Sequence, residues 1–352
     1  MLGCVLAFAG GCRATYYGQA IQGQWHLLAY RQPIARVLAS PQTDAELKEK
    51  LLLVGRLCDF AEHQLKLPAQ GQYVSFVDVG RKHVLWNVYA APEFSIEAKT
   101  WWYPVVGRLK YRGYFAETDA LRCAAKLRQK GWDTYVGGVD AYSTLGWFKE
   151  PVLSTFIREP EPELAGIIFH ELAHEKLFAG GDTDFNEAFA TVVEQEGVRR
   201  WLATNGATEA LRRFEQELLA NDEFQKLLEQ ARQKLREIYE APLPANPGQD
   251  SIEARRKAKA ATFDWLRAEC ARLDKTVGGG SRFGRWASNQ LNNAKLASED
   301  AYHRFVPALR ALMAQNRNDM EAFYSECKRL AKMPKARRHA ALEKLKSPQP
   351  LS

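Results

Sequence analysis

The spacing of apolar residues predicts that the chain begins with helices. Apolar and aromatic side chains, among them Ile21 and Trp25, recur every three to four positions over residues 13–39, which is the spacing of one helix face. Thr43 and Glu46 have the spacing of a capping box, and the helix that they open is predicted to run to about residue 65. The chain is therefore expected to start with a helical tether, followed by a packed helix.

Residues 72–150 show the pattern of strands instead. Aromatic and β-branched residues are frequent here, and turn-forming residues divide them into short runs. Strands are predicted at residues 73–79, 84–90, 101–106, 111–115 and 133–136, and one helix is predicted at about 117–129.

The pattern from residue 151 onward is almost wholly helical. A Pro-rich break at 241–248 predicts a surface linker, and Gly278-Gly279-Gly280 predicts a flexible hinge. These glycines lack the Lys-Ser/Thr of a phosphate-binding loop, which argues against nucleotide binding. Besides a helix around residue 170, helices are predicted at 185–202, 207–219, 222–239, 251–273, 286–297, 299–314 and 319–330.

These patterns predict an α+β fold, in which a mixed β-sheet subdomain precedes a mostly α-helical portion. The expected units are a short apolar segment at 1–11, an N-terminal tether and helix at 12–45, an α/β subdomain at 46–160, a helical subdomain at 161–346 and a tail at 347–352.

The motif HELAH at residues 170–174 lies in a predicted helix with apolar neighbours. With 3.6 residues per turn, His170 and His174 lie on the same helix face, one turn apart. Two neutral imidazoles at this spacing can bind one Zn²⁺, and Glu171 beside them can take a proton from a bound water. Glu163 suits the positive end of this helix. The alternative is a buried helix with two hydrogen-bonded histidines.

A second predicted helix, which begins near residue 185 (FNEAFAT), offers a third ligand. Glu187 can complete the ligand set and leave the fourth position to water, as in a catalytic zinc site. Asp182 and Asp184 are the alternative third ligands. Glu187 is preferred because it starts a helix whose apolar face can dock on the first helix.

Two further residues of this second helix are expected near the metal. Asn186 is expected to cap the helix while touching the site. Glu194 follows Glu187 by two helical turns and is expected to orient a zinc-binding histidine. The alternative for Glu194 is a surface carboxylate.

HELAH followed by NEAFA resembles the gluzincin metallopeptidases, in which two His come from one helix and a Glu from a second. More closely, the chain is similar to the predicted aminopeptidases of bacterial cell envelopes over about residues 16–312. The resemblance implies a gluzincin-like peptidase with one Zn²⁺ per chain, bound by His170, His174 and Glu187. The other segments that carry it are YYGQA (16–20), WNVYAAPE (86–93), YRGYF (111–115) and AYSTLGWF (141–148).

The resemblance also implies a strand that binds peptide substrate at the edge of the sheet by strand addition. Residues 141–146 are the candidate for this strand. The alternative is that the neighbouring glycines only shape turns around a core aromatic residue. The polar side chains of this segment that are candidates for substrate binding are Tyr142, Ser143 and Thr144.

Related peptidases stabilise the oxyanion with a Tyr or a His from the C-terminal helices. Tyr302 is the first candidate for this role and His303 the second. The alternative is that both are ordinary packed or surface residues.

We therefore expect a zinc-dependent peptidase, and more narrowly an aminopeptidase, with Glu171 as general base. An aminopeptidase needs an acidic group for the free amine of its substrate, and Glu93 and Glu150 are the candidates. The alternative from another class is a non-catalytic envelope lipoprotein that zinc stabilises and that acts as an interaction module. Zinc-dependent hydrolysis of a non-peptide amide is a weaker third reading.

Composition and charge limit which binding partners are expected for this chain. The chain has 352 residues, of which 46% are hydrophobic and 26% charged, as is ordinary for a globular protein. The net charge of +7 is diffuse, apart from a basic stretch at 332–346. Since no nucleic-acid recognition motif accompanies this stretch, a solvated face or attraction to an anionic membrane is expected, and no nucleic acid.

The first twelve residues resemble the end of a bacterial lipoprotein signal. A short apolar run at 2–11 ends in AGGC, in which Cys12 would be lipidated. No Lys or Arg precedes this run, Ala9 stands where such signals usually have Leu, and the run is too short to span a bilayer. The resemblance implies a lipid-anchored protein that faces the periplasm, and Arg13 after the cysteine implies the outer membrane.

The remaining cysteines are far apart in the sequence and form no C-x-x-C pair, which argues against a metal cluster. Both disulfides and buried free thiols are compatible with their spacing. These cysteines are Cys58, Cys123, Cys270 and Cys327.

Overall fold

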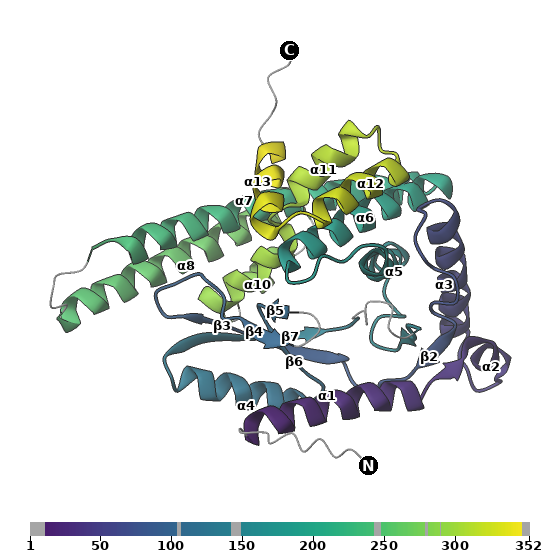
Figure 1. Cartoon of the computed structure of the whole chain (residues 1–352), viewed down its shortest axis with the longest axis horizontal. Coiled ribbons are helices and arrows are strands. Elements are labelled where there is room, and N and C mark those ends of the chain that lie inside the picture. Colours follow the sequence, from purple (N-terminus) through teal and green to yellow (C-terminus); the bar gives the residue numbers. More distant parts are fainter. Residues whose placement is uncertain are drawn as a thin grey trace.

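The computed structural model is mostly helical, and the residues that it describes form three small sheets, which confirms the α+β class (Figure 1). It describes residues 11–103, 107–141, 149–242, 248–278, 281–288 and 290–346, without the side chains of 11–15, 300–303 and 346. None of the helices in these ranges combines the length and the apolarity that crossing a bilayer requires.

The N-terminal part forms α1 (Gly11–Ala29), a short strand β1 (Gln32–Pro33), α2 (Ile34–Ala39) and α3 (Ala45–His63). The predicted capping box was wrong by one residue. Asp44 caps α3 by accepting a hydrogen bond from the Leu47 N–H at 2.8 Å. The Thr43 hydroxyl instead donates to the Val37 carbonyl at 2.8 Å and closes the loop after α2.

The central strand β3 (Leu85–Pro92) is buried on both faces because a helix covers each of them. Trp86 and Val88 point to the face covered by α4 (Glu117–Arg128). Tyr89 and Ala91, of opposite parity, point to the face covered by α10 (Asn293–His303). In Figure 1, α4 and α10 accordingly lie on opposite sides of the sheet.

All strands are short apart from β3 and its neighbour β7. The antiparallel sheet β6–β3–β7 contains β6 (Arg112–Tyr114) and β7 (Trp132–Val139), and β4 (Trp101–Tyr103) pairs with β5 (Gly107–Leu109). A third sheet has the order β1–β2–β8, where β2 (Ser75–Val77) pairs in parallel with β8 (Val152–Leu153). The candidate edge strand at 141–146 lies outside the described residues, except for Ala141.

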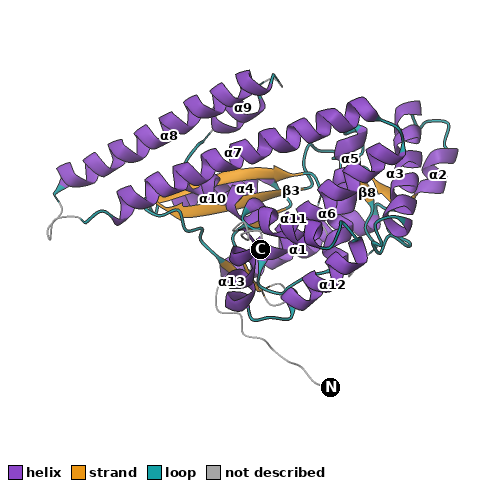
Figure 2. Cartoon of the chain, turned by 90° about the horizontal axis from the view of Figure 1, so that it is seen from above, coloured by secondary structure: helices purple, strands orange, loops and turns teal. Residues whose placement is uncertain are grey.

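Two long helices extend from the body as an antiparallel hairpin, α7 (Thr208–Glu240) and α8 (Gln249–Val277), as Figures 1 and 2 show. They form a small core of their own with α9 (Arg282–Ser288) and the start of α10. We predicted two helices where α7 runs unbroken. No Gly or Pro occurs within α7, so nothing in its sequence ends the helix at residues 220–221.

The main core forms around α5 (Glu161–Lys176) and α6 (Thr183–Thr204). The helices α11 (Val306–Gln315), α12 (Met320–Ala331) and α13 (Lys335–Lys346) lie over α6 (Figure 1). We assigned residues 161–346 to a helical subdomain, but predicted no separate helix at the position of α13. Its Leu342 is nevertheless fully buried, and Arg338 is almost completely so. The described cysteines Cys58, Cys123, Cys270 and Cys327 are free thiols.

The contact between α5 and α6 has no room for an added carbon at Gly197. A Cβ built there would lie 2.7 Å from Cδ2 of Phe169 and 2.8 Å from Cδ1 of Leu65. Phe169 and Leu65 are themselves fully buried. The missing side chain at 197 therefore sets how closely the two helices approach.

We predict that Gly197→Ala lowers the free energy of unfolding by about 1–3 kcal/mol, because the buried ring and methyl group must move. The matched control is Gly55→Ala in α3, where the new methyl group meets nothing within 4 Å. That change is expected to raise stability by about 0.5–1 kcal/mol. Urea unfolding of both variants tests this, and equal effects would contradict the close approach.

Candidate metal centre

The helix α5 begins close to where its sequence predicts. Glu161 and Glu163 lie in its first turn, and Pro162 occupies a position that proline tolerates at a helix start. The helix is buried on most sides, with Phe169 and Leu172 fully inaccessible. His170 and His174 project from one face, and their ring centroids are 4.9 Å apart.

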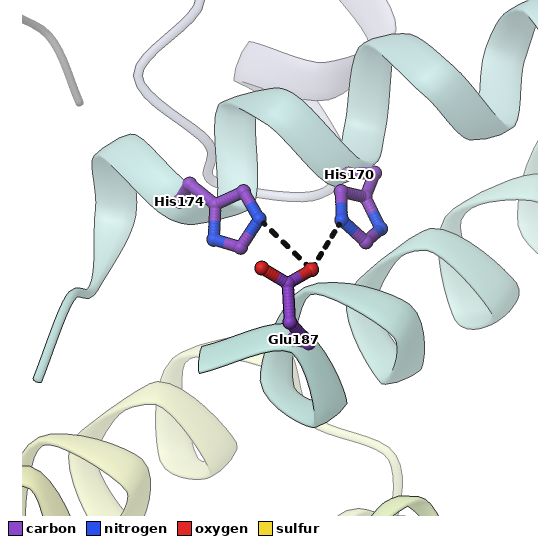
Figure 3. A group of neighbouring side chains, drawn as sticks. All are labelled: His170, His174 and Glu187. Atoms are coloured by element: carbon purple, nitrogen blue, oxygen red, sulfur yellow. Dashed lines mark ion pairs between the residues drawn. The ribbon is translucent and has the colours of Figure 1, made fainter. Parts of the chain in front are cut away.

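Glu187 on α6 faces both histidines (Figure 3). Its Oε2 lies 3.4 Å from Nε2 of His170 and 3.6 Å from Nε2 of His174. One ligand atom from each of the three side chains can be chosen so that all lie within 4.8 Å of one another. Two nitrogens and one carboxylate oxygen thus converge on one point between the helices.

The short connection from α5 to α6 is held by Asn186. Its Oδ1 accepts from the Ala179 N–H at 2.8 Å, and its Nδ2 donates to the Ala179 carbonyl at 3.0 Å. Our prediction that Asn186 caps α6 was wrong, because α6 begins three residues earlier at Thr183. Gly181 supplies the left-handed turn of this connection, with φ of +74°.

Glu194, two turns further along α6, contacts the other nitrogen of His170. Its Oε2 lies 2.9 Å from Nδ1 of His170. Gly166 on α5 leaves room for this carboxylate, since a Cβ there would lie 3.3 Å from Oε1 of Glu194. A proton on Nδ1 of His170 would leave Nε2 as the lone-pair donor that faces Glu187.

The charges of these side chains depend on one another. Burial alone would raise the pKa of Glu187, but the two histidines outweigh it and hold that pKa far below its usual range. Burial alone would lower the pKa of His170, but its hydrogen bonds with Glu187 and Glu194 raise it. An anionic carboxylate against two imidazoles is an arrangement that a cation can stabilise directly.

Two buried polar atoms at this point have no hydrogen-bond partner among the described residues, Oε2 of Glu171 and Nδ1 of His174. Burial is the main reason that the pKa of Glu171 is raised. Glu171 also lines a pocket together with Tyr73, Ala141 and Glu150. The donor set and the unpartnered oxygen of Glu171 fit a zinc ion with a bound water, because that water would give the carboxylate oxygen a polar neighbour.

The other acidic candidates have different partners. Asp182 is fully buried and contacts Arg338 and His339 of α13, each at 2.9 Å. Asp184 pairs with Lys110 at 2.7 Å. The proposed ligand group therefore leaves both aspartates out.

Glu93 and Glu150, the two candidates for binding an amine, lie in different surroundings. Glu93 pairs with Arg256 at 2.6 Å, on the side of α8. Glu150 is 5% exposed and lines the pocket that contains Glu171.

The remaining predicted site residues lie outside what the structure describes. This holds for Tyr142, Ser143 and Thr144, for the side chains of Tyr302 and His303 at the end of α10, and for the side chain of Cys12 in the first turn of α1.

Two tyrosines at the site were missed by the sequence reasoning. Burial raises the pKa of Tyr111, and the charges of Glu187 and Glu171 raise it further. Burial likewise raises the pKa of Tyr73, with Glu171 as its first charged neighbour. Tyr111 begins the segment YRGYF, so that distinctive segment was the available signal. Tyr73 has φ of +53°, a strained conformation for tyrosine that no sequence pattern indicates.

The chain matches the family described as "Putative aminopeptidase" over residues 15–342 and therefore belongs to this family. The match spans the strand-rich part, both helices that carry the HELAH motif and Glu187, and most of the C-terminal helices. No curated protein matches the chain, and no solved structure does either.

We predict that Asp182→Asn lowers the free energy of unfolding by about 3–5 kcal/mol at neutral pH, because it leaves the buried Arg338 without its anion. Asp222→Asn is the control. Asp222 pairs with Arg310 at 2.7 Å, and both side chains are about a third exposed, far more than Asp182 and Arg338, so this pair is expected to contribute about 1 kcal/mol or less. Urea unfolding of both variants measures the difference.

The loss of unfolding free energy caused by Asp182→Asn should be smaller in acid. Burial alone would raise the pKa of Asp182, but His339, Lys335 and Arg338 lower it. A carboxyl whose pKa is lower in the folded state stabilises the protein above its unfolded pKa, and loses that effect as pH falls through the folded value. The Asp182→Asn deficit should therefore be full at pH 7 and smaller below about pH 4. A deficit that stays constant over this range would contradict the ion-pair explanation.

Proposed function

We propose that this protein is a zinc-dependent peptidase, and more narrowly an aminopeptidase. The observation that carries the proposal is the convergence of His170, His174 and Glu187 on one point, beside an unpartnered oxygen of Glu171. Family membership supports peptidase activity independently of this geometry. A structural zinc site usually has four protein ligands and does not need Glu171, so the set of three candidate ligands among the described residues favours catalysis.

His170, His174 and Glu187 would bind the ion. A zinc ion at this point supplies Lewis acidity, which polarises a carbonyl group and lowers the pKa of a bound water to about 7. Glu171 would accept the proton of the attacking water and later pass it to the leaving amine. Its raised pKa suits the first of these steps, because a carboxylate whose conjugate acid holds the proton more tightly is a stronger base.

Tyr111 would donate a hydrogen bond to the oxyanion that forms on the carbonyl oxygen. Glu187 and Glu171 both act on its phenol, which places it near the reacting groups. Its raised pKa keeps the phenol protonated, as a donor must be. This assignment replaces neither Tyr302 nor His303, which remain predictions.

Glu150 would bind the free amine of the substrate. It is buried in the pocket shared with Glu171, and its charge contributes to the raised pKa of Glu175, which burial and Glu150 bring to about 7. A carboxylate at this position favours a cationic ligand group. Glu93 is less suited, because it is not among the described residues that line this pocket and lies instead against Arg256 of α8.

We predict that Glu171→Gln lowers peptidase activity by about a hundredfold or more and leaves the bound zinc in place, because Glu171 acts as the general base and is not a proposed zinc ligand. His170→Ala should lose both the zinc and the activity. The measurement pairs zinc content with assays on aminoacyl and internally quenched peptides. Zinc without activity on either substrate would favour the structural-zinc alternative, and a chain that binds no zinc would refute the proposal.

We predict that Glu150→Gln raises KM for aminoacyl substrates at least about tenfold, since the buried partner of the substrate ammonium loses its charge. Activity on the same peptides with an acetylated N-terminus should change little. Glu93→Gln serves as the control and is expected to behave like the parent protein. If Glu150→Gln affects both kinds of substrate equally, Glu150 does not select the amine.

A further inference from the structure

The turn between α3 and β2 carries a buried glutamine, Gln72. Its backbone N–H donates to the Ala69 carbonyl at 3.0 Å, and Gly71 before it has φ of +73°. Gln72 is only 7% exposed, so its side-chain amide is withdrawn from water. A buried amide of this kind is costly unless both its oxygen and its nitrogen have hydrogen-bond partners.

Both ends of the Gln72 amide have a partner, and these two partners lie in different parts of the fold. Oε1 of Gln72 accepts from the Glu150 N–H at 2.8 Å. Nε2 of Gln72 donates to a carboxylate oxygen of Glu175 at 2.7 Å. Glu175 directly follows the candidate ligand His174 on α5. One side chain therefore joins the backbone of Glu150 to the helix that carries two of the candidate zinc ligands.

The residues next to Gln72 and Glu150 strengthen this junction. The Tyr73 N–H donates to the Glu150 carbonyl at 2.8 Å, so both backbone polar groups of Glu150 are bound by positions 72 and 73. Nζ of Lys149 donates to the Gln70 carbonyl at 3.0 Å. Tyr73 keeps its φ of +53°, and such strain persists only where the surrounding contacts determine the conformation. The backbone of Glu150 is thus fixed against this turn.

Glu150 and Glu171 line the same pocket, and the proposed function gives them separate tasks. Glu150 would bind the free amine of the substrate, and Glu171 would act at the scissile bond. In a peptide, the free amine is separated from the first carbonyl carbon by the Cα atom alone. Cleavage after the first residue therefore requires the amine-binding carboxylate to stay at a fixed distance from the metal. A displacement of about 1 Å can lower the rate of a catalysed step about a hundredfold.

We propose that Gln72 is a positioning residue, which holds Glu150 at the distance from α5 that selects the first peptide bond for cleavage. This inference rests on the proposed function. A glutamine suits the position, because its oxygen accepts from the Glu150 N–H while its nitrogen donates to Glu175. Glutamate has no N–H to offer Glu175, and asparagine is one carbon shorter. Gln72 is not among the described residues that line the pocket, so it would act through Glu150 and not on the substrate itself.

The test compares the parent chain with Gln72→Met, which keeps the length of the side chain and removes both hydrogen bonds. We expect KM for aminoacyl substrates to rise at least about tenfold, with the zinc content unchanged and a smaller effect on kcat. The inhibition constant of leucinamide, a probe with a free amine, should rise by a similar factor. Inhibition by N-acetyl-leucinamide, which has no free amine, should be the same for both proteins.

An exchange of the two partners provides a rescue that a general loss of stability would not show. Gln72→Glu alone places a carboxylate against that of Glu175 and should weaken substrate binding at least as much as Gln72→Met does. Adding Glu175→Gln again places an N–H between the two side chains, in the opposite direction, and keeps the net charge of the parent. KM of this double variant should return most of the way to the parent value.

The matched control is Gln195→Met on α6. Gln195 is 9% exposed and accepts from Nε of Arg310 at 2.9 Å, so this change also removes a hydrogen bond of a buried glutamine, but none to Glu150. It should lower the thermal stability and leave KM and the inhibition by leucinamide as in the parent chain.

Two kinds of failure can be told apart. If the parent chain is an active aminopeptidase and Gln72→Met leaves KM unchanged, or if the exchange with Glu175→Gln restores nothing, Gln72 does not position Glu150 and this inference is wrong. A parent chain that releases no amino acid from any free-amine peptide would instead refute the proposed aminopeptidase activity, and this inference with it.

Discussion

The packing of α5 against α6 is the constraint on which the rest of the site depends. Gly197 lets α6 lie directly against Phe169 and Leu65, and this close contact brings Glu187 opposite the two histidines of α5. The two helices also share a polar contact, since Nε1 of Trp201 donates to Glu161 at 2.7 Å. A dense, buried helix pair holds its side chains in one geometry, which is what a ligand set from two helices requires.

Charged and polar side chains with partners lie on two sides of this apolar contact between α5 and α6. At one end, Glu194 and Glu187 contact opposite nitrogens of His170. At the other, Asp182 is enclosed by side chains of α13, and Asn186 closes the backbone of the connection between α5 and α6. The C-terminal helix therefore supports the connection that positions Glu187, although it contributes no proposed ligand. Buried charges are retained in such a place because each has a partner of opposite sign.

Sequence reasoning worked best where the signal was local. Helical periodicity placed α5, α6 and α12 to within a few residues, and the HELAH spacing put both histidines on one face. Prediction from the sequence failed where a contact between residues far apart in the chain decided the position of a side chain or helix. Asn186 has the chemistry of a cap, but Ala179 takes its side chain. The helix α13 has the composition of a solvated tail, but Asp182 pairs with its Arg338.

The amino-acid sequence by itself determined the fold class, the two helices that carry the candidate metal ligands, and the candidate residues His170, Glu171, His174 and Glu187, because these follow from periodicity and short spacings along the chain. Only the tertiary structure decided that Asp182 and Asp184 have partners other than the histidines, that Glu150 shares a pocket with Glu171, and that the charges of Glu187 and Glu171 reach Tyr111. These outcomes depend on contacts across tens or hundreds of residues, and no local pattern carries that information.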